Sequence, residues 1–326
     1  MKSVVTGGSG FIGSHLVDLL LSHDHEVVII DNLSSGNLDN IKHISKKIII
    51  HKEDITSKGK FINDVTDCDF LFHIAGLADV VPSIDRPMDY YNANVLGTLN
   101  IANILRDNKN IKKVIYAASS SCYGIPVETP TTEECPIDTR YPYANTKHLG
   151  ENIIMHFGKV YKIPTISMRF FNVYGTRART TGTYGAVFGT FLAQKLANSP
   201  YTIVGDGEQK RDFIHVSDLI EGIYSASQST IHSDIFNLGT GKPHSINELV
   251  DIIGGEKIYI PKRPGEPDIT QADISKISQK LNWTPKISFE EGVKNMLENI
   301  SYWKDAPLWT PEKIDLATKN WFKHLA

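Results

Sequence analysis

The stretch that most restricts the fold is a glycine-rich loop close to the start of the chain. A short apolar run from Lys2 to Thr6 leads into glycines at positions 7, 10 and 13, and a helical pattern of leucines follows. Glycines at this spacing permit a tight turn and let backbone N–H groups approach a pyrophosphate at the start of a helix. The order of strand, loop and helix therefore predicts a dinucleotide site that includes Gly7, Gly10, Phe11, Ile12 and Gly13.

A carboxylate follows the next apolar run. The second strand is expected from Glu26 to Ile30, and Asp31 comes directly after it. A carboxylate about 20 residues beyond such glycines accepts hydrogen bonds from an adenosine ribose diol and repels a 2′-phosphate, which favours NAD over NADP. The alternative is an aspartate that only caps a helix or turn. We assign the turn-forming residues after it to the same cofactor: Asn32, Ser35 and Gly36.

Three further apolar runs, at 48–50, 69–75 and 113–118, alternate with helical segments. Continuous apolar runs indicate strands that are covered on both faces, as in a parallel sheet. We therefore predict an α/β fold, with a Rossmann-type doubly wound parallel sheet and a smaller, mainly C-terminal α/β substrate domain. The first domain is expected to comprise residues 1–172 and about 213–242, and the second about 173–212 and 243–326. Ligands of such sheets bind beyond the carboxyl ends of the strands, where Gly7, Asp31, Ala75 and Ser119 fall.

Tyr143 and Lys147 lie four residues apart in a segment with helical character. Residues at this spacing share a face of a helix, and an ammonium beside a phenol lowers the pKa of the phenol. Such a tyrosine serves as a general base near neutral pH, and the hydroxyl of Ser119, at the end of the preceding strand, can hold the reacting oxygen. The pair alone is weak evidence, because both residues are common on helix surfaces. The cofactor motifs that precede it make Ser119, Tyr143 and Lys147 our catalytic candidates.

The composition excludes several classes of function. With 34 Lys and Arg, 37 Asp and Glu and a net charge of −3, the chain has no cationic block for nucleic acid or an anionic membrane. Its three cysteines, at 68, 122 and 135, are too few and too scattered for a disulfide framework or a zinc site. No apolar run approaches the roughly 20 residues of a membrane helix, and the N-terminus has no signal core. We expect a cytoplasmic protein without a metal.

Along the whole chain these motifs resemble the extended short-chain dehydrogenase/reductases, in the branch of nucleotide-sugar epimerases and dehydratases. The resemblance is carried by the glycine loop, Asp31, Ser119 and the Tyr143/Lys147 pair. It extends through further motifs in the family's order: Asp54-Ile55, residues 73–76, Asn94, residues 169–175 and residues 211–216. Because it spans both predicted domains, the resemblance implies the activity as well as the fold.

The resemblance implies a set of cofactor contacts beyond the glycine loop. In this family the residue matching Lys147 also holds the nicotinamide ribose. The carboxylate of Asp54 either hydrogen-bonds the adenine amino group or only stabilises a turn, and the sequence favours neither. The remaining positions assigned to NAD are Ile55, Ala75, Ala78, Asn94, Tyr143 and Phe170.

The same resemblance assigns Asn172, Arg211 and Arg263 to the diphosphate of a nucleoside-diphosphate sugar. Arginine suits that role because its planar guanidinium binds phosphate oxygens bidentately. Thr270 takes the position that limits the space beside the C2 substituent of the sugar, where a 2-acetamido group is expected to fit. The substrate contacts are completed by Ser119, Ser120 and Ser121. Arg177 and Arg179 are further candidates for a phosphate contact, although a surface role is the default for both.

For the reaction, the resemblance implies transient oxidation of the sugar at C4, rotation of the ketone in the site and reduction on its other face. Relatives that eliminate water or decarboxylate carry carboxylates between the serine and the tyrosine, whereas Ser120, Ser121 and Cys122 stand there in this chain. Cys122 is interpreted as a packing residue rather than a proton donor. We therefore expect an isomerase, an NAD-dependent 4-epimerase of a UDP-hexose or UDP-N-acetylhexosamine. The alternatives are a UDP-glucuronate epimerase, 4,6-dehydratase or reductase of the same branch, and a catalytically silent NAD-binding scaffold.

The family also implies an assembly and a pathway class. Relatives dimerise through two helices, which correspond to residues 88–106 and 143–160, so that two copies form a four-helix bundle. Synthesis of polysaccharide precursors is the process that the family suggests. The segment 302–309 and a helix beginning at Thr310-Pro311 extend past the usual end of the family. Their tryptophans are interpreted as packing or interface residues.

Overall fold

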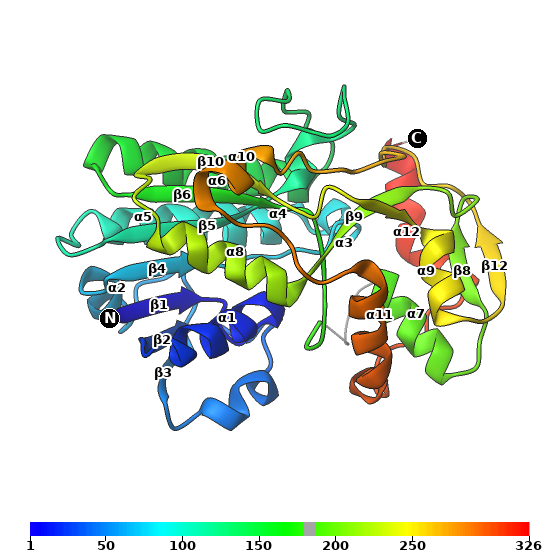
Figure 1. The fold of residues 1–326 in the computed structure, drawn as a ribbon, viewed down its shortest axis with the longest axis horizontal. Helices are drawn as coiled ribbons and strands as arrows, with labels where there is room; N and C mark the ends of the chain where they lie inside the picture. Colours follow the sequence, from blue (N-terminus) through cyan, green and yellow to red (C-terminus); the bar gives the residue numbers. More distant parts are fainter. Residues whose placement is uncertain (179–186, 326) are drawn as a thin grey trace.

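A seven-stranded parallel sheet forms the larger part of the computed structural model, which describes residues 1–178 and 187–325 (Figure 1). The strand order is β10-β6-β5-β4-β1-β2-β3, and every neighbouring pair runs parallel. This arrangement confirms the predicted α/β class. The strands are β1 (Lys2–Thr6), β2 (Glu26–Ile30), β3 (Ile48–His51), β4 (Phe70–His73), β5 (Lys113–Ser119), β6 (Thr165–Phe170) and β10 (Ser233–Leu238).

The central strands are buried along their entire length. All residues of β4 and β5 are buried, because helices cover both faces of the sheet. The parallel register aligns the carboxyl ends: Thr6 pairs with both Ile30 and His73, and Ser119 pairs with Phe170. The loops that follow β1, β2, β4 and β5 therefore leave the sheet at one edge.

Helices pack on both faces of this sheet (Figure 1). On one face, Leu16 and Leu20 of α1 meet Leu219 of α8 in a continuous core. On the other face, Ile101 of α5 and Ile154 of α6 contribute to a second core. Burying one such side chain completely stabilises the fold by roughly 1.5–3 kcal/mol. The helices are α1 (Phe11–Ser22), α2 (Ile62–Thr66), α5 (Gly97–Leu105), α6 (Pro142–Tyr161) and α8 (Val216–Gln228), with the short α3 (Pro82–Asp85) and α10 (Ser275–Leu281) nearby.

The helix predicted at 88–106 contains a wide turn. α4 (Pro87–Tyr90) continues into a π-helical segment, Tyr91–Leu96, which continues into α5. Turns of this kind are rare and often occur at functional sites. Here the segment contains Asn94, which hydrogen-bonds both to α6 and to the loop that follows β4.

A smaller lobe is built from two short sheets and the helices around them. Its core is aromatic: the ring centroids of Tyr174 and Phe188 lie 4.6 Å apart and those of Phe213 and Phe289 lie 5.3 Å apart, both in stacked geometry. Trp303 is fully buried in the same core, as a packing role requires. One sheet comprises β7 (Asn172–Tyr174), β9 (Lys210–His215) and β11 (Pro243–Ser245), and the other β8 (Tyr201–Val204) and β12 (Lys257–Ile260). The helices are α7 (Val187–Leu196), α9 (Ile246–Ile253), α11 (Phe289–Glu298) and α12 (Pro311–Leu325).

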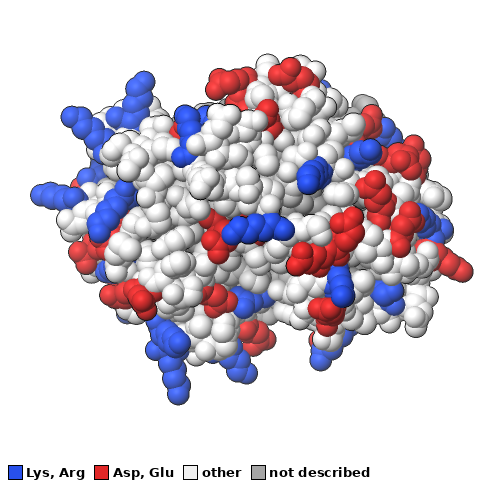
Figure 2. Space-filling view, viewed as in Figure 1, with Lys and Arg blue, Asp and Glu red and all other residues white. Residues whose placement is uncertain are grey.

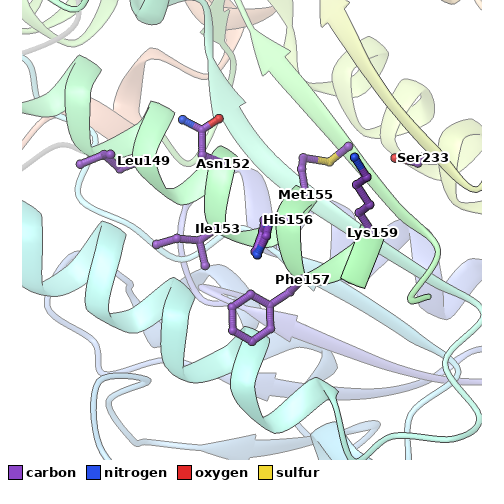
Figure 3. Close-up of a pocket in the computed structure, with 8 residues that line it drawn as sticks. All are labelled: Leu149, Asn152, Ile153, Met155, His156, Phe157, Lys159 and Ser233. Carbon is purple, nitrogen blue, oxygen red and sulfur yellow. The ribbon is translucent and has the colours of Figure 1, made fainter. Parts of the chain in front are cut away.

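The outer face of α6 carries an open hollow of about 660 Å³ (Figure 3). Its lining is largely apolar and includes Leu149, Ile153, Met155 and Phe157. On the neighbouring α5 and the turn before it, Leu96 and Leu99 are 46% and 40% exposed. The two helices therefore present an uncovered apolar surface on the side facing away from the sheet.

Charged side chains of both signs are interspersed on the face of the molecule shown in Figure 2. This pattern agrees with the near balance of Lys and Arg with Asp and Glu in the sequence. Among the described residues, no helix combines the length and the hydrophobicity that crossing a bilayer requires.

Candidate active site

The glycine loop between β1 and α1 leaves no room for side chains. Gly7 has a φ of +73°, and a Cβ there would come 2.8 Å from the backbone nitrogen of Ala75. A Cβ at Gly13 would lie 2.1 Å from the carbonyl oxygen of Gly7. Gly10, the N-cap of α1, offers no side chain to the first N–H groups of the helix. The loop thus keeps the anion-binding end of a helix accessible to a phosphate, as its spacing predicted.

Asp31 lies at the carboxyl end of β2 and shapes this loop. Its carboxylate accepts hydrogen bonds from the backbone N–H groups of Ser9 (2.9 Å) and Leu33 (2.8 Å). Burial raises the pKa of Asp31, and the two backbone donors counteract this effect. A Cβ on Gly36 would lie 2.7 Å from one carboxylate oxygen, so that loop also approaches closely. The predicted ribose ligand is therefore positioned beside the glycines by direct contacts.

Asp54 has the turn role that was one of its two interpretations. Its carboxylate accepts hydrogen bonds from the backbone N–H and the hydroxyl of Thr56 (2.8 and 2.7 Å) and from the Asn32 amide (2.8 Å). Burial alone would raise the pKa of Asp54, but these donors together lower it. The neighbouring Ile55 side chain lies in the core beneath α5, so only its backbone can face a ligand.

Asn94 joins the loop after β4 to α6. Its amide oxygen accepts from the Leu77 N–H (2.8 Å), while its amide nitrogen donates to the Leu77 carbonyl (3.1 Å) and the Thr146 hydroxyl (3.0 Å). The residue is 1% exposed. Ala75 and Ala78 flank Leu77 in sequence, so Asn94 holds in place the backbone that was assigned to the cofactor.

Tyr143 and Ser119 meet at the edge of the sheet where β5 ends and α6 begins. Tyr143 is the second residue of α6, directly after the proline that occupies the first helical position. Burial raises the pKa of Tyr143, and a hydrogen bond with Ser119 opposes that rise. The predicted lowering of the Tyr143 pKa by Lys147 is thus wrong for this structure, because the cost of burying a phenolate dominates.

Lys147 is buried one turn further along the same helix. Its ammonium lies 4.8 Å from the centroid of the Tyr116 ring and 3.6 Å from the place that a Cβ on Gly76 would occupy. Burial lowers the pKa of Lys147 to about 8, against the attraction of Glu151, which raises it. Burial therefore makes this lysine easier to deprotonate than a lysine in water.

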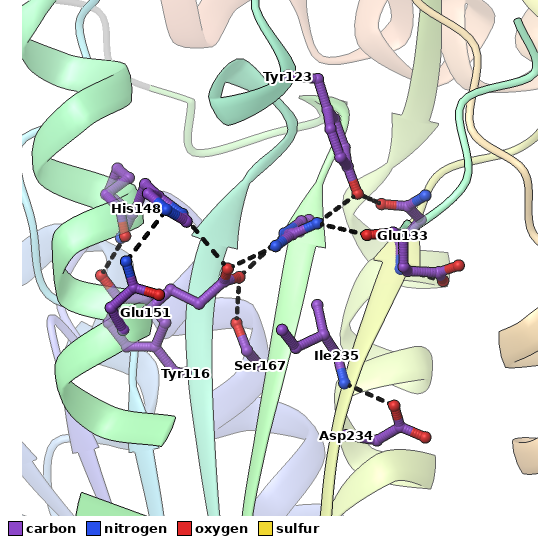
Figure 4. Close-up of polar contacts among 12 residues, drawn as sticks. Tyr116, Tyr123, Glu133, His148, Glu151, Ser167, Asp234 and Ile235 are labelled. Carbon is purple, nitrogen blue, oxygen red and sulfur yellow. Dashed lines mark hydrogen bonds and ion pairs between the residues drawn. The ribbon is translucent and has the colours of Figure 1, made fainter. Parts of the chain in front are cut away.

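Glu151, a further turn along α6, belongs to a buried polar network that sequence reasoning missed (Figure 4). Its carboxylate accepts from Arg169 at 2.7 and 3.1 Å and from the Ser167 hydroxyl at 2.8 Å. Arg169 in turn donates to the hydroxyl of Tyr123 (2.8 Å). Burial would raise the pKa of Glu151, but its donors hold it at about 2. A carboxylate four residues after Lys147 was the available signal, since that spacing keeps it on the same face.

Two arginines of the smaller lobe converge on one carboxylate. Glu266 lies 3.0 Å from Nε of Arg263 and 3.5 Å from Nη2 of Arg211. These residues line a cavity of about 260 Å³ together with Lys210 and Gln209. The position of Glu266 shows that both guanidinium groups can share one anion. Glu266 was not among the predicted site residues, although its place three residues after Arg263 was a signal.

Asn172 and Thr270, from distant parts of the sequence, are brought together by the fold. The Thr270 hydroxyl donates to the amide oxygen of Asn172 at 3.2 Å and accepts from the backbone N–H of Asp212 at 3.3 Å. Phe170 is buried at the end of β6, two residues before Asn172. The substrate positions thus continue from the sheet edge into the smaller lobe.

Ser120, Ser121 and Cys122 form a short 3-10 turn after Ser119. Ser119 donates to the Ser121 hydroxyl at 3.1 Å, and Ser121 also hydrogen-bonds Tyr141, another residue that was not predicted. Cys122 is buried in a small core with Phe171, and burial raises the pKa of its thiol to about 12. A thiol in that state packs rather than donates protons, in agreement with its interpretation.

Two arginines that follow residues 169–175, Arg177 and Arg179, were further candidates for a phosphate contact. Arg177 pairs with Asp18 of α1 at 2.7 Å, the surface role that was its default. Arg179 lies outside the described residues. Within the described part of the chain, no group of His, Cys, Asp and Glu is arranged to hold a metal ion.

Comparison with known proteins places this geometry in context. The profile of the family described as GDP-mannose 4,6 dehydratase matches residues 4–296. A UDP-glucose 4-epimerase of Mycolicibacterium smegmatis is 32% identical over 317 residues, covering 91% of this chain and 98% of the relative. A UDP-N-acetylglucosamine 4-epimerase structure from Methanobrevibacter ruminantium, in complex with UDP-N-acetylmuramic acid, is 34% identical with a TM-score of 0.85. The match covers 91% of this chain and 98% of the chain in that structure. A UDP-glucuronic acid 4-epimerase of Bacillus cereus, in complex with UDP-glucuronic acid and NAD, is 30% identical with a TM-score of 0.86, covering 92% and 99%.

Proposed function

Because the chain belongs to the GDP-mannose 4,6-dehydratase family, the extended short-chain dehydrogenase/reductases that modify nucleotide sugars, we propose that it is an NAD-dependent 4-epimerase of a UDP-linked sugar. The observation that carries the proposal is the hydrogen bond between Ser119 and Tyr143 at the sheet edge where the glycine loop and Asp31 also lie. The ammonium of Lys147 is buried one turn further along α6, near Gly76 of the loop after β4. A UDP-hexose or UDP-N-acetylhexosamine is the proposed substrate.

The residues at the edge fit NAD. Gly7, Gly10 and Gly13 provide the close approach that a pyrophosphate needs, and Asp31 would hold the adenosine ribose. On the other side of the loop, Lys147 would hold the nicotinamide ribose. The nicotinamide, when bound, supplies an acceptor for the hydride from the sugar and later returns it.

The proton chemistry is assigned to Tyr143. Its phenolic oxygen takes the proton of the C4 hydroxyl as a general base. Tyr143 then returns the proton to the ketone oxygen as the hydride returns to C4. Ser119, which is hydrogen-bonded to Tyr143, orients the reacting oxygen.

The diphosphate of the substrate is assigned to Arg211 and Arg263. Both guanidinium groups already share the Glu266 carboxylate, so they are spaced to share a phosphate. Asn172 and Thr270 would border the sugar end of the same site. The choice of epimerase over dehydratase rests on Ser120, Ser121 and Cys122, because none of them supplies the acid and base that elimination demands.

The substrate assignment predicts a measurable product. The purified protein is incubated separately with UDP-glucose, UDP-N-acetylglucosamine and UDP-glucuronic acid. We expect it to convert UDP-glucose or UDP-N-acetylglucosamine to the C4 epimer, which NMR distinguishes by the C4 proton couplings. The catalytically silent alternative predicts no conversion of any of them. A stable keto product from another nucleotide sugar, without epimers, would instead show a dehydratase.

We also propose a homodimer through α5 and α6. These helices carry an uncovered apolar surface that includes Ile153 and Phe157 (Figure 3). The exposed side chains of Leu96 and Leu99 extend it, and two such helix pairs pack as a four-helix bundle. Sedimentation at micromolar concentration is expected to show a dimer, and Leu99→Glu to shift it towards monomer. Leu316→Glu, a charge introduced at a 75% exposed position of α12, is the matched control. A monomeric parent protein would contradict the assignment.

A further inference from the structure

α12 lies beyond the residues that the family profile matches and stands where the two lobes meet, beside α3 (Figure 1). One face of this helix is buried: Ile314, Thr318 and Trp321 are 3%, 2% and 1% exposed. Their spacing of four and three residues places them on one stripe. By contrast, Leu316 is 75% exposed. The helix therefore uses a single face to contact the rest of the chain.

The first contact of that face is the loop that follows the cofactor positions Ala75 and Ala78. Val81 is buried in a small core with Ile314 and Trp321. The Asn320 amide donates to the Asp85 carboxylate of α3 at 2.7 Å. α12 thus packs against the larger lobe at the point where the chain leaves β4 and passes the Tyr143 site.

The second contact is the start of the catalytic helix. The ring centroids of Trp321 and Tyr141 lie 5.3 Å apart. Tyr141 precedes Pro142 and Tyr143 and is the N-cap of α6, and its hydroxyl hydrogen-bonds Ser121. The indole of Trp321 therefore supports the backbone that presents Tyr143.

The third contact is the arginine loop of the smaller lobe. The indole N–H of Trp321 donates to the carbonyl of Pro264 at 2.9 Å, directly after Arg263. Leu325 at the end of α12 lies 3.7 Å from the place that a Cβ on Gly265 would occupy. Ahead of the helix, the Trp309 carbonyl accepts from Gln194 of α7 at 2.8 Å. The segment is thus fastened to both lobes.

We propose that α12 is a strap that sets the width of the nucleotide-sugar site, and that Trp321 is the positioning residue through which it acts. One indole contacts the start of the Tyr143 helix with its ring and the Arg263 loop with its N–H. These groups stand at the sugar end and the diphosphate end of the proposed substrate, so their separation determines whether both ends are held together. The inference rests on the proposed function and adds a residue to the substrate site.

The test compares two substitutions at Trp321 in the full-length protein. Trp321→Phe keeps a ring against Tyr141 but lacks the N–H, and Trp321→Ala removes both contacts. We expect Trp321→Ala to raise two constants at least about tenfold: the KM for the UDP-sugar and the Kd of UDP, which calorimetry measures. The value of kcat should change by less than about threefold. Trp321→Phe is expected to raise both constants about threefold, the effect of one hydrogen bond. The Kd of NAD stays within about twofold of the parent value, because the glycine loop is not touched.

The control is Leu316→Ala on the exposed face of the same helix, which should leave all constants unchanged. If Trp321→Ala only reduced the fraction of folded protein, it would lower kcat and leave KM unchanged. A lower kcat with an unchanged KM would therefore contradict the proposed role of α12. An unchanged UDP affinity in folded Trp321→Ala would overturn it as well, and if that variant does not fold, an unchanged affinity in Trp321→Phe has the same meaning. If the parent protein binds UDP but epimerises no sugar, the proposed reaction is wrong. The UDP affinities of the variants would still test whether α12 positions the substrate site through Trp321.

Discussion

Tyr143→Phe is expected to lower kcat by about a hundred- to ten-thousand-fold, the contribution of a positioned general acid and base. The substitution removes only the phenolic oxygen, so the ring and its edge-to-face contact with Tyr90 remain. Without that oxygen, neither Ser119 nor Lys147 has a partner that carries the proton to and from the sugar. Steady-state kinetics on the epimerised sugar measure the loss, and the Kd of NAD shows that the cofactor site is intact.

Tyr161→Phe provides the matched control. Tyr161 ends the same helix, is 45% exposed and contacts Arg106 rather than the site. Removal of the Tyr161 hydroxyl should leave kcat within about twofold of the parent value. If Tyr143→Phe kept a tenth or more of the parent kcat, another group would have to move the proton, and the assignment of Tyr143 would fail.

Arg169→Ala is expected to lower the free energy of unfolding by about 3–5 kcal/mol, because it leaves the Glu151 carboxylate buried without its cation. The two side chains are 5% and 2% exposed, and Glu151 lies on α6 while Arg169 lies on β6. Removal of the arginine also takes away one of the two hydrogen-bond partners of the Tyr123 hydroxyl, which still donates to Asn237 at 2.6 Å. Urea unfolding monitored by circular dichroism measures the change from the shift in midpoint.

An exposed pair of the same length is the comparison. Arg140 and Asp138 are also 2.7 Å apart, but their side chains are 39% and 49% exposed. Water screens such a pair, so Arg140→Ala should cost only about 0–1 kcal/mol. Equal effects of the two substitutions would mean that burial adds nothing to the Glu151–Arg169 pair.

Patterns confined to short stretches predicted the fold and the outline of the site. The glycine spacing, the apolar runs and the serine at the end of β5 depend on local geometry, and the structure has the strands, the loop and Ser119 where these patterns indicated. Parallel register then brings the strand ends to one edge, so positions far apart in sequence meet without further information. The residues of the candidate site were found this way, although their roles remain proposals.

What sequence reasoning missed depends on contacts between distant segments. The pKa of Tyr143 follows from how deeply α6 is buried, which the spacing of Tyr143 and Lys147 does not contain. Glu266 becomes a site residue only because the fold places it between two arginines. Trp321 looked like a packing residue, and its contact with Pro264 requires two loops and a helix to be in place.

Asn94 and Ile55 illustrate a different limit. Both occupy positions assigned to the cofactor, yet the Asn94 amide is engaged with Leu77 and Thr146, and the Ile55 side chain lies in the core. A motif identifies a position along the backbone, whereas the direction of each side chain is decided by packing. What the structure shows of Asn94 is that it holds the backbone of Leu77, next to the Ala78 position that was assigned to the cofactor.

In the proposed reaction, the hydrogen removed from C4 returns to the same sugar. A UDP-sugar that carries deuterium at C4, incubated with the protein in ordinary water, tests it directly by NMR and mass spectrometry. Transient oxidation predicts a C4 epimer that retains its deuterium at C4, with none lost to solvent. An epimer whose C4 deuterium has been replaced by a solvent proton would contradict it, because inversion would then proceed by proton exchange at carbon rather than by transient oxidation.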